Sequence, residues 1–585
     1  MFFTGCNAVK NVPKGKQLLT KNTIKVNHKQ VNDATAKSVL RQKPNKQVDV
    51  PFTELVLWRP YLMLYNWGNP EKEKGFGHWL TKIGEAPVIL DSALVLNSAK
   101  QLGQYYYNNG YFLNEVEFKI DFRKDSTLAD VTYNIYAGPQ YYFNHIEYII
   151  SSPGIVEVVN TVKDQSLIKA GQTYSTKLLE EERDRLVLSL RNNGYYGFPK
   201  NIVRFEADTS AGDHGVNVKL IVGDKPSSVG DSIFYIEHLP YAIKNIYLNP
   251  TFSFSTNELA PLDTAIYKSI TITQKLPIKY KANFLESQVH FKPGEFYSEQ
   301  KVKESYRHLT GNRVFRIAEI NFETVTGDTT NALNAFIKLE PFDKRTFSAE
   351  LEGTNTAGNY GVAGVITMAT RNFFKGGEIV DVSFRGGLEA QVNVQDNNSV
   401  FNTKELGVEL GVNFPRFLFF GGLNQRIAKR MEPKSRVFTS YSYQTRVEFE
   451  RTILAFGLLY NWRESNTKFH QINLVDINYV HLPRINQDYL NSLEFKTGFQ
   501  DNLIAATRYT FQYDNQKVTK ERASQFFKFS AETAGNMLAA LNNNGNFAQD
   551  EETEQYLVLG VPYAQYVKFD VDFRNYINLT DEHQF

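Results

Sequence analysis

The chain has 585 residues, too many for one domain, and its 65 basic and 63 acidic side chains leave a formal net charge of +2, so charge gives no bias toward nucleic acid. Mean hydropathy is −0.38, and no apolar stretch approaches the roughly 18 residues that a membrane-spanning helix needs. The single cysteine, Cys6, excludes an intrachain disulfide framework and a thiolate metal cluster.

The first residues place a small residue directly before that cysteine. The stretch Phe3-Thr4-Gly5-Cys6 resembles the end of a bacterial lipoprotein signal, in which the cysteine becomes acylated. A full signal also has a basic start and an apolar run of about 7–15 residues, so we expect its beginning to lie upstream. We interpret Cys6 as the lipidation site and residues 1–16 as a start with a flexible tether. The alternative is an ordinary cysteine in a disordered start.

The next 325 or so residues read as three copies of one β-α-α-β-β unit. In the first copy, repeat 1 (residues 17–138), we expect a strand, a short helix, a longer helix capped by Asp91 or Ser92, and two strands. These elements cover residues 18–27, 32–42, 91–107, 111–122 and 129–136. Repeat 2 (residues 139–225) has the same order, over residues 141–150, 154–164, 175–190, 201–207 and 216–222. Repeat 3 (residues 226–341) is a weaker copy, with a strand over residues 243–252, then an insertion, and then elements over residues 299–309, 316–325 and 331–339.

Glycines mark where the long helices end. Gly110 follows Asp91 by 19 positions, and Gly194 follows Ser175 by the same 19, whereas Gly311 follows Ser298 by only 13. Glycine suits the left-handed position that terminates a helix, so we expect structural turns at all three. The shared Gly-x-x-Tyr-Ser and Asn-Asn-Gly-Tyr elements argue against three unrelated α+β domains. Repeats of this kind favour a binding array over a catalytic fold.

Residues 342–585 alternate strictly between apolar and polar side chains. In the run 566–579, Val567, Phe569, Val571 and Phe573 share one face, and charged residues occupy the other. We count roughly eleven such runs, including one over 493–499, each of roughly 9–14 residues and near the length that crosses a bilayer at a tilt. A transmembrane barrel with lipid outside and a polar lumen explains the pattern. A large secreted β-sandwich is the alternative.

Taken together, this order of elements resembles the POTRA-plus-barrel superfamily of outer-membrane assembly proteins, the BamA/TamA group or bacterial surface antigens. Three repeats match the TamA-like branch, and residues 82–87 and 413–418 resemble TamA-like lipoproteins of Bacteroidetes. The superfamily's Arg-Gly-aromatic loop motif is absent, because the only Arg-Gly pair, Arg385-Gly386, lies in a strand-like run. The strand count also falls below the family's sixteen, so we expect the C-terminal barrel strands to be missing.

The resemblance implies a translocation and assembly module that works without ATP. Periplasmic repeats would bind unfolded outer-membrane clients along the exposed edge of the second strand of each repeat. The residues implied for this edge are Tyr111, Phe112, Phe118, Ile202, Phe205, Ile317 and Ile320. The barrel seam, implied to template client strands beside outer-membrane lipid, would include Phe347, Ala349, Leu351 and Gly353. The implied partner is a TamB-like inner-membrane protein.

Other functions stay open at this level. A POTRA-bearing secretion or transport pore, and phospholipid transport to the outer membrane with a TamB-like partner, use the same architecture. A soluble adhesin-like protein is a third possibility. We predict no enzyme, cofactor, nucleic-acid partner or metal site, because no phosphate-binding loop or His-Glu-x-x-His motif occurs, and His145 and Glu147 have no evident third ligand.

Overall fold

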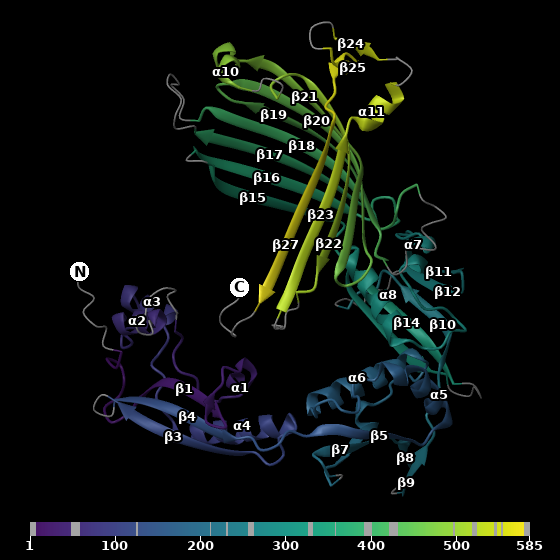
Figure 1. Cartoon of the computed structure of the whole chain (residues 1–585). Helices are drawn as coiled ribbons and strands as arrows, with labels where there is room; N and C mark the ends of the chain where they lie inside the picture. The colour runs from purple at the N-terminus through teal and green to yellow at the C-terminus, as the bar shows by residue number, and fades with distance from the viewer. Residues whose placement is uncertain are drawn as a thin grey trace. The chain divides into compact units, whose positions relative to one another are not determined.

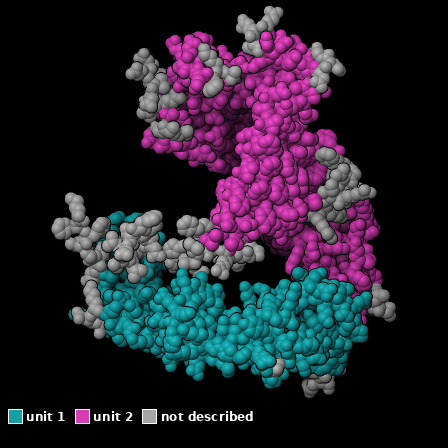
Figure 2. Space-filling view, in the orientation of Figure 1, with its two compact units in different colours: residues 1–190, 197–238 teal, residues 191–196, 239–585 magenta. Residues whose placement is uncertain are grey.

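The computed structural model describes residues 8–47, 59–123, 127–210, 212–229, 232–254, 262–325, 331–356, 359–390, 401–419, 431–494, 498–516, 523–542, 547–550 and 554–577. Contacts divide the chain into two compact units (Figure 2). Unit 1 comprises residues 1–190 and 197–238, and unit 2 comprises residues 191–196 and 239–585. Among the described residues, no helix combines the length and the hydropathy needed to cross a bilayer. Cys6 lies outside them.

Repeat 1 forms a four-stranded sheet covered by helices. Its elements are β1 (Leu18–Val26), β2 (Lys29–Gln30), α1 (Ala34–Ser38), α2 (Pro60–Trp67), α3 (Phe76–Ile83), α4 (Ser92–Asn108), β3 (Glu115–Arg123) and β4 (Leu128–Tyr136). The strand order is β2-β1-β4-β3, with β1 and β4 parallel. Asp91 caps α4 by accepting hydrogen bonds from the backbone N–H groups of Ala93 and Leu94. Leu102 of α4 packs with Ile24 and Tyr133 of the sheet in one buried core. The pair α2 and α3 is an insertion that the repeat pattern does not predict.

Repeat 2 has the same core with three strands. Its elements are β5 (Tyr142–Ile150), α5 (Pro153–Val162), the 3-10 helix η1 (Lys163–Gln165), α6 (Thr176–Asn192), the 3-10 helix η2 (Lys200–Ile202), β6 (Val203–Asp208) and β7 (Gly215–Val222), in sheet order β5-β7-β6. A separate hairpin follows, β8 (Lys225–Val229) with β9 (Ser232–Ile236). This hairpin belongs to unit 1, although the sequence boundary at residue 225 assigns it to repeat 3.

Repeat 3 extends the sheet to five strands. Its elements are β10 (Ala242–Asn249), β11 (Leu262–Tyr267), β12 (Ile270–Lys275), α7 (Ala282–Ser287), α8 (Glu299–Gly311), β13 (Phe315–Thr324) and β14 (Ala332–Pro341), in order β11-β12-β10-β14-β13. Ser298 caps α8 through its side chain and the backbone N–H of Lys301. The turn predicted at Gly311 is wrong, because Gly311 is the last residue of α8. Asn312 caps the helix end, and Arg313 takes the left-handed backbone with φ of 58°.

The rest of unit 2 is one ten-stranded antiparallel sheet in which each strand pairs with the next (Figure 1). Its strands are β15 (Arg345–Thr356), β16 (Asn359–Arg371), β17 (Ile379–Ala390), β18 (Thr403–Phe414), β19 (Lys434–Thr445), β20 (Phe449–Arg463), β21 (Lys468–Ile485), β22 (Asn502–Asp514), β23 (Ala523–Ala534) and β27 (Tyr566–Ile577). Short elements lie between them: α10 (Gln487–Ser492), α11 (Asn536–Leu541), β24 (Ala548–Gln549), β25 (Tyr556–Val558) and β26 (Val561–Pro562).

The fold class expected from the sequence is confirmed: α+β repeats precede a large antiparallel sheet of barrel type. The strand expected over residues 493–499 is not found at the residues described there, 493, 494, 498 and 499. Because β21 pairs directly with β22, the chain must reverse between them, and α10 begins that reversal, with Asn486 as its cap. The described residues on either side of 495–497 are not in a strand.

Candidate functional site

The second strand of each β-α-α-β-β unit lies at one edge of its sheet among the described residues, and β2, β5 and β11 form the opposite edges. The strands β3, β6 and β13 each pair with a single neighbour, namely β4, β7 and β14. Such an edge presents a row of free N–H and C=O groups on which an extended peptide can add a strand. These are the second strands of the repeats, where the sequence places client binding.

The side chains named for these edges divide into exposed and packed ones. Phe118 of β3 and Ile317 of β13 are exposed, at 38% and 40% of their surface. Phe205 of β6 and Ile320 of β13 pack against the cores of their repeats. An incoming strand would therefore meet two exposed apolar side chains on β3, Phe118 and Phe122, and one on β13, Ile317. That arrangement favours affinity from the main chain over sequence specificity.

Three residues named for the edges lie outside them. Tyr111 and Phe112 precede β3, which begins at Glu115, and Ile202 lies in η2 rather than in β6. Phe112 packs edge-to-face against Tyr141 and at a tilt against Tyr174, with ring centroids 5.0 Å apart in both pairs. Phe112 thus packs into the next repeat, where its burial outweighs continuation of the strand, whereas Tyr111 packs on Tyr106 and the core of its own repeat.

The Asn-Asn-Gly-Tyr elements form the joints between repeats. Gly110 and Gly194 have φ of +86° and +99°, the left-handed region that glycine tolerates. The backbone N–H of Tyr141 donates to Gly110 O at 2.9 Å, and the N–H of Tyr241 donates to Gly194 O at the same distance. Beside the second joint, Tyr196 packs on Tyr297 at 5.0 Å. The glycine that follows α4 and the glycine that follows α6 therefore each bind the residues at the start of the next repeat through a backbone hydrogen bond.

The ten-stranded sheet exposes its apolar face. One row of facing residues crosses seven strands from β15 to β21. The row is Phe347, Met368, Val382, Leu410, Thr439, Phe456 and Ile477. Of these, Phe347 is 65% exposed and Met368 55%. At the other end of the sheet, Val567, Phe569, Val571 and Phe573 of β27 are all about 60% exposed or more. A protein that folds in water alone would cover such a surface.

The opposite face carries charges in complementary positions. Arg436 donates to Asp381 at 2.9 Å and to Glu409 at 2.6 Å. Between β23 and β27, Lys528 faces Asp572 and Glu532 faces Lys568. Glycines make room for the large side chains: a Cβ on Gly411 would collide with the Arg436 guanidinium. This wall is polar and paired along its length, as the lumen of a barrel is.

The strands at the two ends of the sheet hold the residues named for the seam. Among the described residues, β15 pairs only with β16, and β27 only with β23. On β15, Phe347, Ala349, Leu351 and Gly353 share the apolar face, and Leu351 is 84% exposed. A Cβ on Gly353 would meet no atom within 4 Å. These residues lie along an unpaired edge; their role in templating client strands stays a prediction.

Repeat 3 is fastened to the turns at one end of the sheet. The backbone N–H of Lys281 donates to Lys375 O at 2.7 Å, and the Asn372 amide donates to Lys279 O at 2.8 Å. Gly377, with φ of +81°, lies against the Phe284 ring. Near the end of α8, Arg307 pairs with Glu432 at 2.5 Å. The last repeat and the first turns of the sheet therefore hold one another in register.

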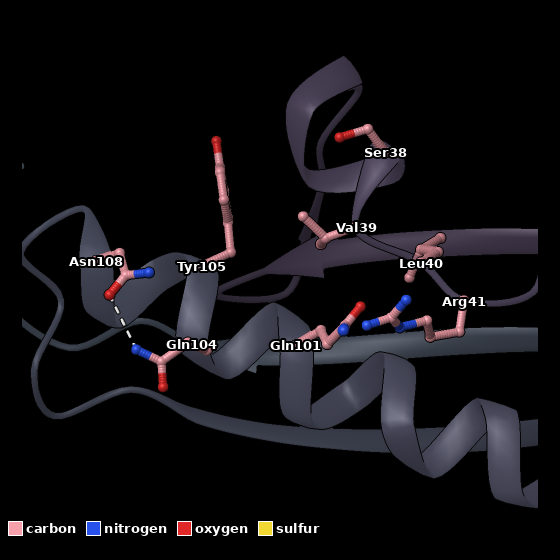
Figure 3. A pocket seen from close by; sticks show the side chains of 8 residues that line it. All are labelled: Ser38, Val39, Leu40, Arg41, Gln101, Gln104, Tyr105 and Asn108. Carbon is pink, nitrogen blue, oxygen red and sulfur yellow. Dashed lines mark hydrogen bonds between the residues drawn. The ribbon is translucent and has the colours of Figure 1, made fainter. Parts of the chain in front are cut away.

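A cavity lies between α1 and α4 (Figure 3). Its volume is about 400 Å³, and Arg41, Gln101, Gln104, Tyr105 and Asn108 give it a polar lining. The Tyr105 hydroxyl donates to Asp33 at 3.0 Å, and burial together with Asp33 raises the pKa of Tyr105. In the part of the chain that the structure describes, no group of three or more His, Cys, Asp or Glu side chains is placed to hold a metal ion.

Comparison with known proteins finds similarity among solved structures alone. No protein-family model matches the chain. No curated protein matches it either. BamA from Haemophilus ducreyi lacking POTRA domains 1–3 aligns at 12% identity over 76% of this chain and 68% of that one, with a TM-score of 0.39. CdiB from Escherichia coli aligns at 9% identity over 76% and 66%, with a TM-score of 0.33. BamA POTRA domains 3–5 from Haemophilus influenzae align at 15% identity over 56% and 99%, with a TM-score of 0.28. The chain is similar to these structures at low sequence identity.

Proposed function

We propose that this chain is a bacterial outer-membrane protein whose periplasmic repeats receive unfolded outer-membrane proteins and whose sheet delivers them to lipid. The carrying observation is the inverted polarity of the ten-stranded sheet, with apolar side chains outward and paired charges on the other face. Lipid satisfies the first face, and a polar, water-filled lumen satisfies the second.

The edges of β3, β6 and β13 supply the receiving surface. A client strand that pairs with such an edge satisfies its backbone polar groups before it reaches the membrane. The unpaired edge of β15 offers the same pairing next to lipid. Transfer from repeat to sheet then needs no nucleotide, because the client's apolar face is released into hydrocarbon as its backbone becomes paired.

Within this function we assign the chain to the translocation and assembly module type. Three repeats and the lipoprotein-like start support that assignment, and a TamB-like inner-membrane protein is the partner that it implies. Co-purification from cross-linked envelopes tests the partner independently of client insertion. Recovery of no inner-membrane protein would remove this assignment and leave the insertion activity standing.

The function is tested by client folding in liposomes that contain the full chain. A photo-cross-linking amino acid at Phe118, on the edge of β3, should capture an unfolded barrel client, and one at Lys100, on the exposed side of α4, should not. The client's insertion rate, followed by its gel shift, should rise several-fold over empty liposomes. Ion conductance without faster insertion would favour a secretion or transport pore and contradict the proposal.

A further inference from the structure

The helical pair α2–α3, inserted in repeat 1, carries large apolar side chains on its surface. The exposed fractions are 45% for Tyr61, 61% for Trp67, 73% for Phe76, 53% for Trp79 and 41% for Ile83. On α3, Phe76, Trp79 and Ile83 follow helical spacing and share one face, and no residue of that helix is buried. The rings of Phe76 and Trp79 stack with centroids 5.5 Å apart. Water alone gives no reason to keep such a face exposed.

The other side of this helical pair is already closely packed. A Cβ on Gly84 would lie 2.4 Å from the backbone of Tyr65, and one on Gly68 would lie 2.5 Å from the Thr81 side chain. The backbone N–H of Glu85 donates to Tyr61 O at 2.9 Å. Because glycines bring the helices together and fix their faces, the aromatic stripe has no room to turn inward. It remains available to a partner.

The start of the described chain is tied to the same helices. The Lys10 ammonium donates to Asn66 O at 2.6 Å, and the Asn66 amide donates to Ala8 O at 3.3 Å. Cys6 precedes Ala8 by two residues, which span at most about 7 Å. Figure 1 shows α2 and α3 as neighbours in this part of the chain. A lipid on Cys6 would therefore enter the bilayer within reach of the stripe.

Positive charge near the stripe comes from Lys82, which is exposed on α3, and from the tether. Lys10, Lys14 and Lys16 are exposed, and no Asp or Glu occurs before Asp33. The loop between the helices adds nothing net, because its two lysines stand beside two glutamates. Exposed tryptophan and phenylalanine beside a basic segment match the interface of a bilayer that contains anionic lipid. A protein partner would not account for the lysines at the lipid-anchor end.

We propose that the α2–α3 pair is a membrane-docking element that lays Phe76, Trp79 and Ile83 into the surface of a phospholipid bilayer containing anionic lipid. It rests on the outer-membrane location proposed above. Docking would hold repeat 1 against the membrane surface, where clients arrive.

The test uses the full chain in phosphatidylethanolamine–phosphatidylglycerol vesicles. Cys6→Ser removes the native thiol, and Phe76→Cys carries an environment-sensitive fluorophore. Nitroxide lipids labelled at the headgroup should quench this probe several-fold more than a probe at Lys177→Cys, whose side chain is 84% exposed on α6. Adding Trp79→Ser should remove most of the difference. Lys14→Gln with Lys16→Gln should weaken quenching in these vesicles and not in phosphatidylcholine.

A probe at Phe569→Cys with acyl-chain nitroxides separates this inference from the proposed function. Quenching at Phe569 together with equal, weak quenching at Phe76 and Lys177 overturns the docking element and leaves the barrel standing. No quenching at Phe569 overturns both. A Phe76 probe that becomes shielded without lipid as protein concentration rises would identify a second copy of the chain as the occupant and overturn the proposal.

Discussion

Gly377 shows how a single residue secures repeat 3 to the sheet. Its φ is +81°, and an added Cβ would lie 2.4 Å from the Phe284 ring. We expect Gly377→Ala to lower the free energy of unfolding of unit 2 by about 2–5 kcal/mol, since strain and collision add. Gly294→Ala is the matched control, with φ of +85° and open space around it, and should cost about 1–2 kcal/mol. Equal losses in urea titrations would contradict the close contact.

His308 predicts a pH dependence near the end of α8. Its ring lies 4.3 Å from that of His290 between centroids, and His290 is 3.9 Å from the Glu304 carboxylate. Burial lowers the pKa of His308 to about 4, against the opposing effect of Glu432. Between pH 6.5 and about 4, His308 is protonated in the unfolded chain and neutral in the folded chain. The free energy of unfolding should therefore fall as pH drops from 6.5 toward 4, by up to about 1.4 kcal/mol per pH unit.

The measurement is the slope of stability against pH. Hydrogen exchange in α8, followed through urea titrations at several pH values, reports it. His308→Gln should flatten the slope, whereas His145→Gln, at an exposed position on β5, should leave it unchanged. A slope that survives His308→Gln would assign the dependence to another group.

The structural role of some residues can be predicted from the sequence, and that of others cannot. Asp91 before an apolar helical pattern predicts its own cap, because capping is local. Phe112 reads as strand, since its neighbours alternate, and only the partners Tyr141 and Tyr174 in the next repeat draw it away. The Gly311 turn fails for a similar reason: Arg313 can take the left-handed position at the junction with the sheet.

At the scale of the strand, polarity assigns the two faces of the sheet. Phe456 is 45% exposed on the apolar face, and Ser440, one position away in register, lies on the charged face opposite Glu409. We expect Phe456→Lys to cost about 2–4 kcal/mol in lipid if the site lies near the bilayer midplane. Ser440→Lys should be tolerated, since Glu409 offers a partner. Stability in lipid vesicles is measured by heat-modified gel mobility. Equal losses of stability in the two lysine variants would contradict the assignment of the two faces.

Elements were predictable where their pattern is long. Twelve-residue alternation identifies strands such as β27, because few other structures repeat every second residue. The short run at 493–499 carries the same signal, yet its described residues, 493, 494, 498 and 499, follow α10 and are not in a strand. The aromatic pair α2–α3 interrupts the repeat pattern, and no local feature of the sequence says that its apolar face stays exposed.

For the whole molecule, two compact units predict two unfolding transitions. Unit 1 has the cores of small soluble domains, whereas unit 2 contains the ten-stranded sheet and its continuous hydrogen bonds. We expect urea to release the amide protons of β4 and β7 before those of β20, because sheet strands embedded in lipid have no water to replace their bonds. Hydrogen exchange with mass spectrometry in vesicles measures the order. Simultaneous release would show a single cooperative unit.

The contact between the end of a long helix and the start of the next repeat has a practical consequence for engineering the three repeats. Residues 191–196 belong by contact to the unit that follows them, although α6 begins in the unit before. A chimaera cut at residue 225, where the sequence suggests a boundary, would contain the first strand of repeat 3 without Gly194 and Tyr196, the residues that pack and bond with that repeat. Exchange of repeats among related proteins should succeed when the donor fragment begins just after Leu190, so that the transplanted repeat keeps residues 191–196, which it contacts.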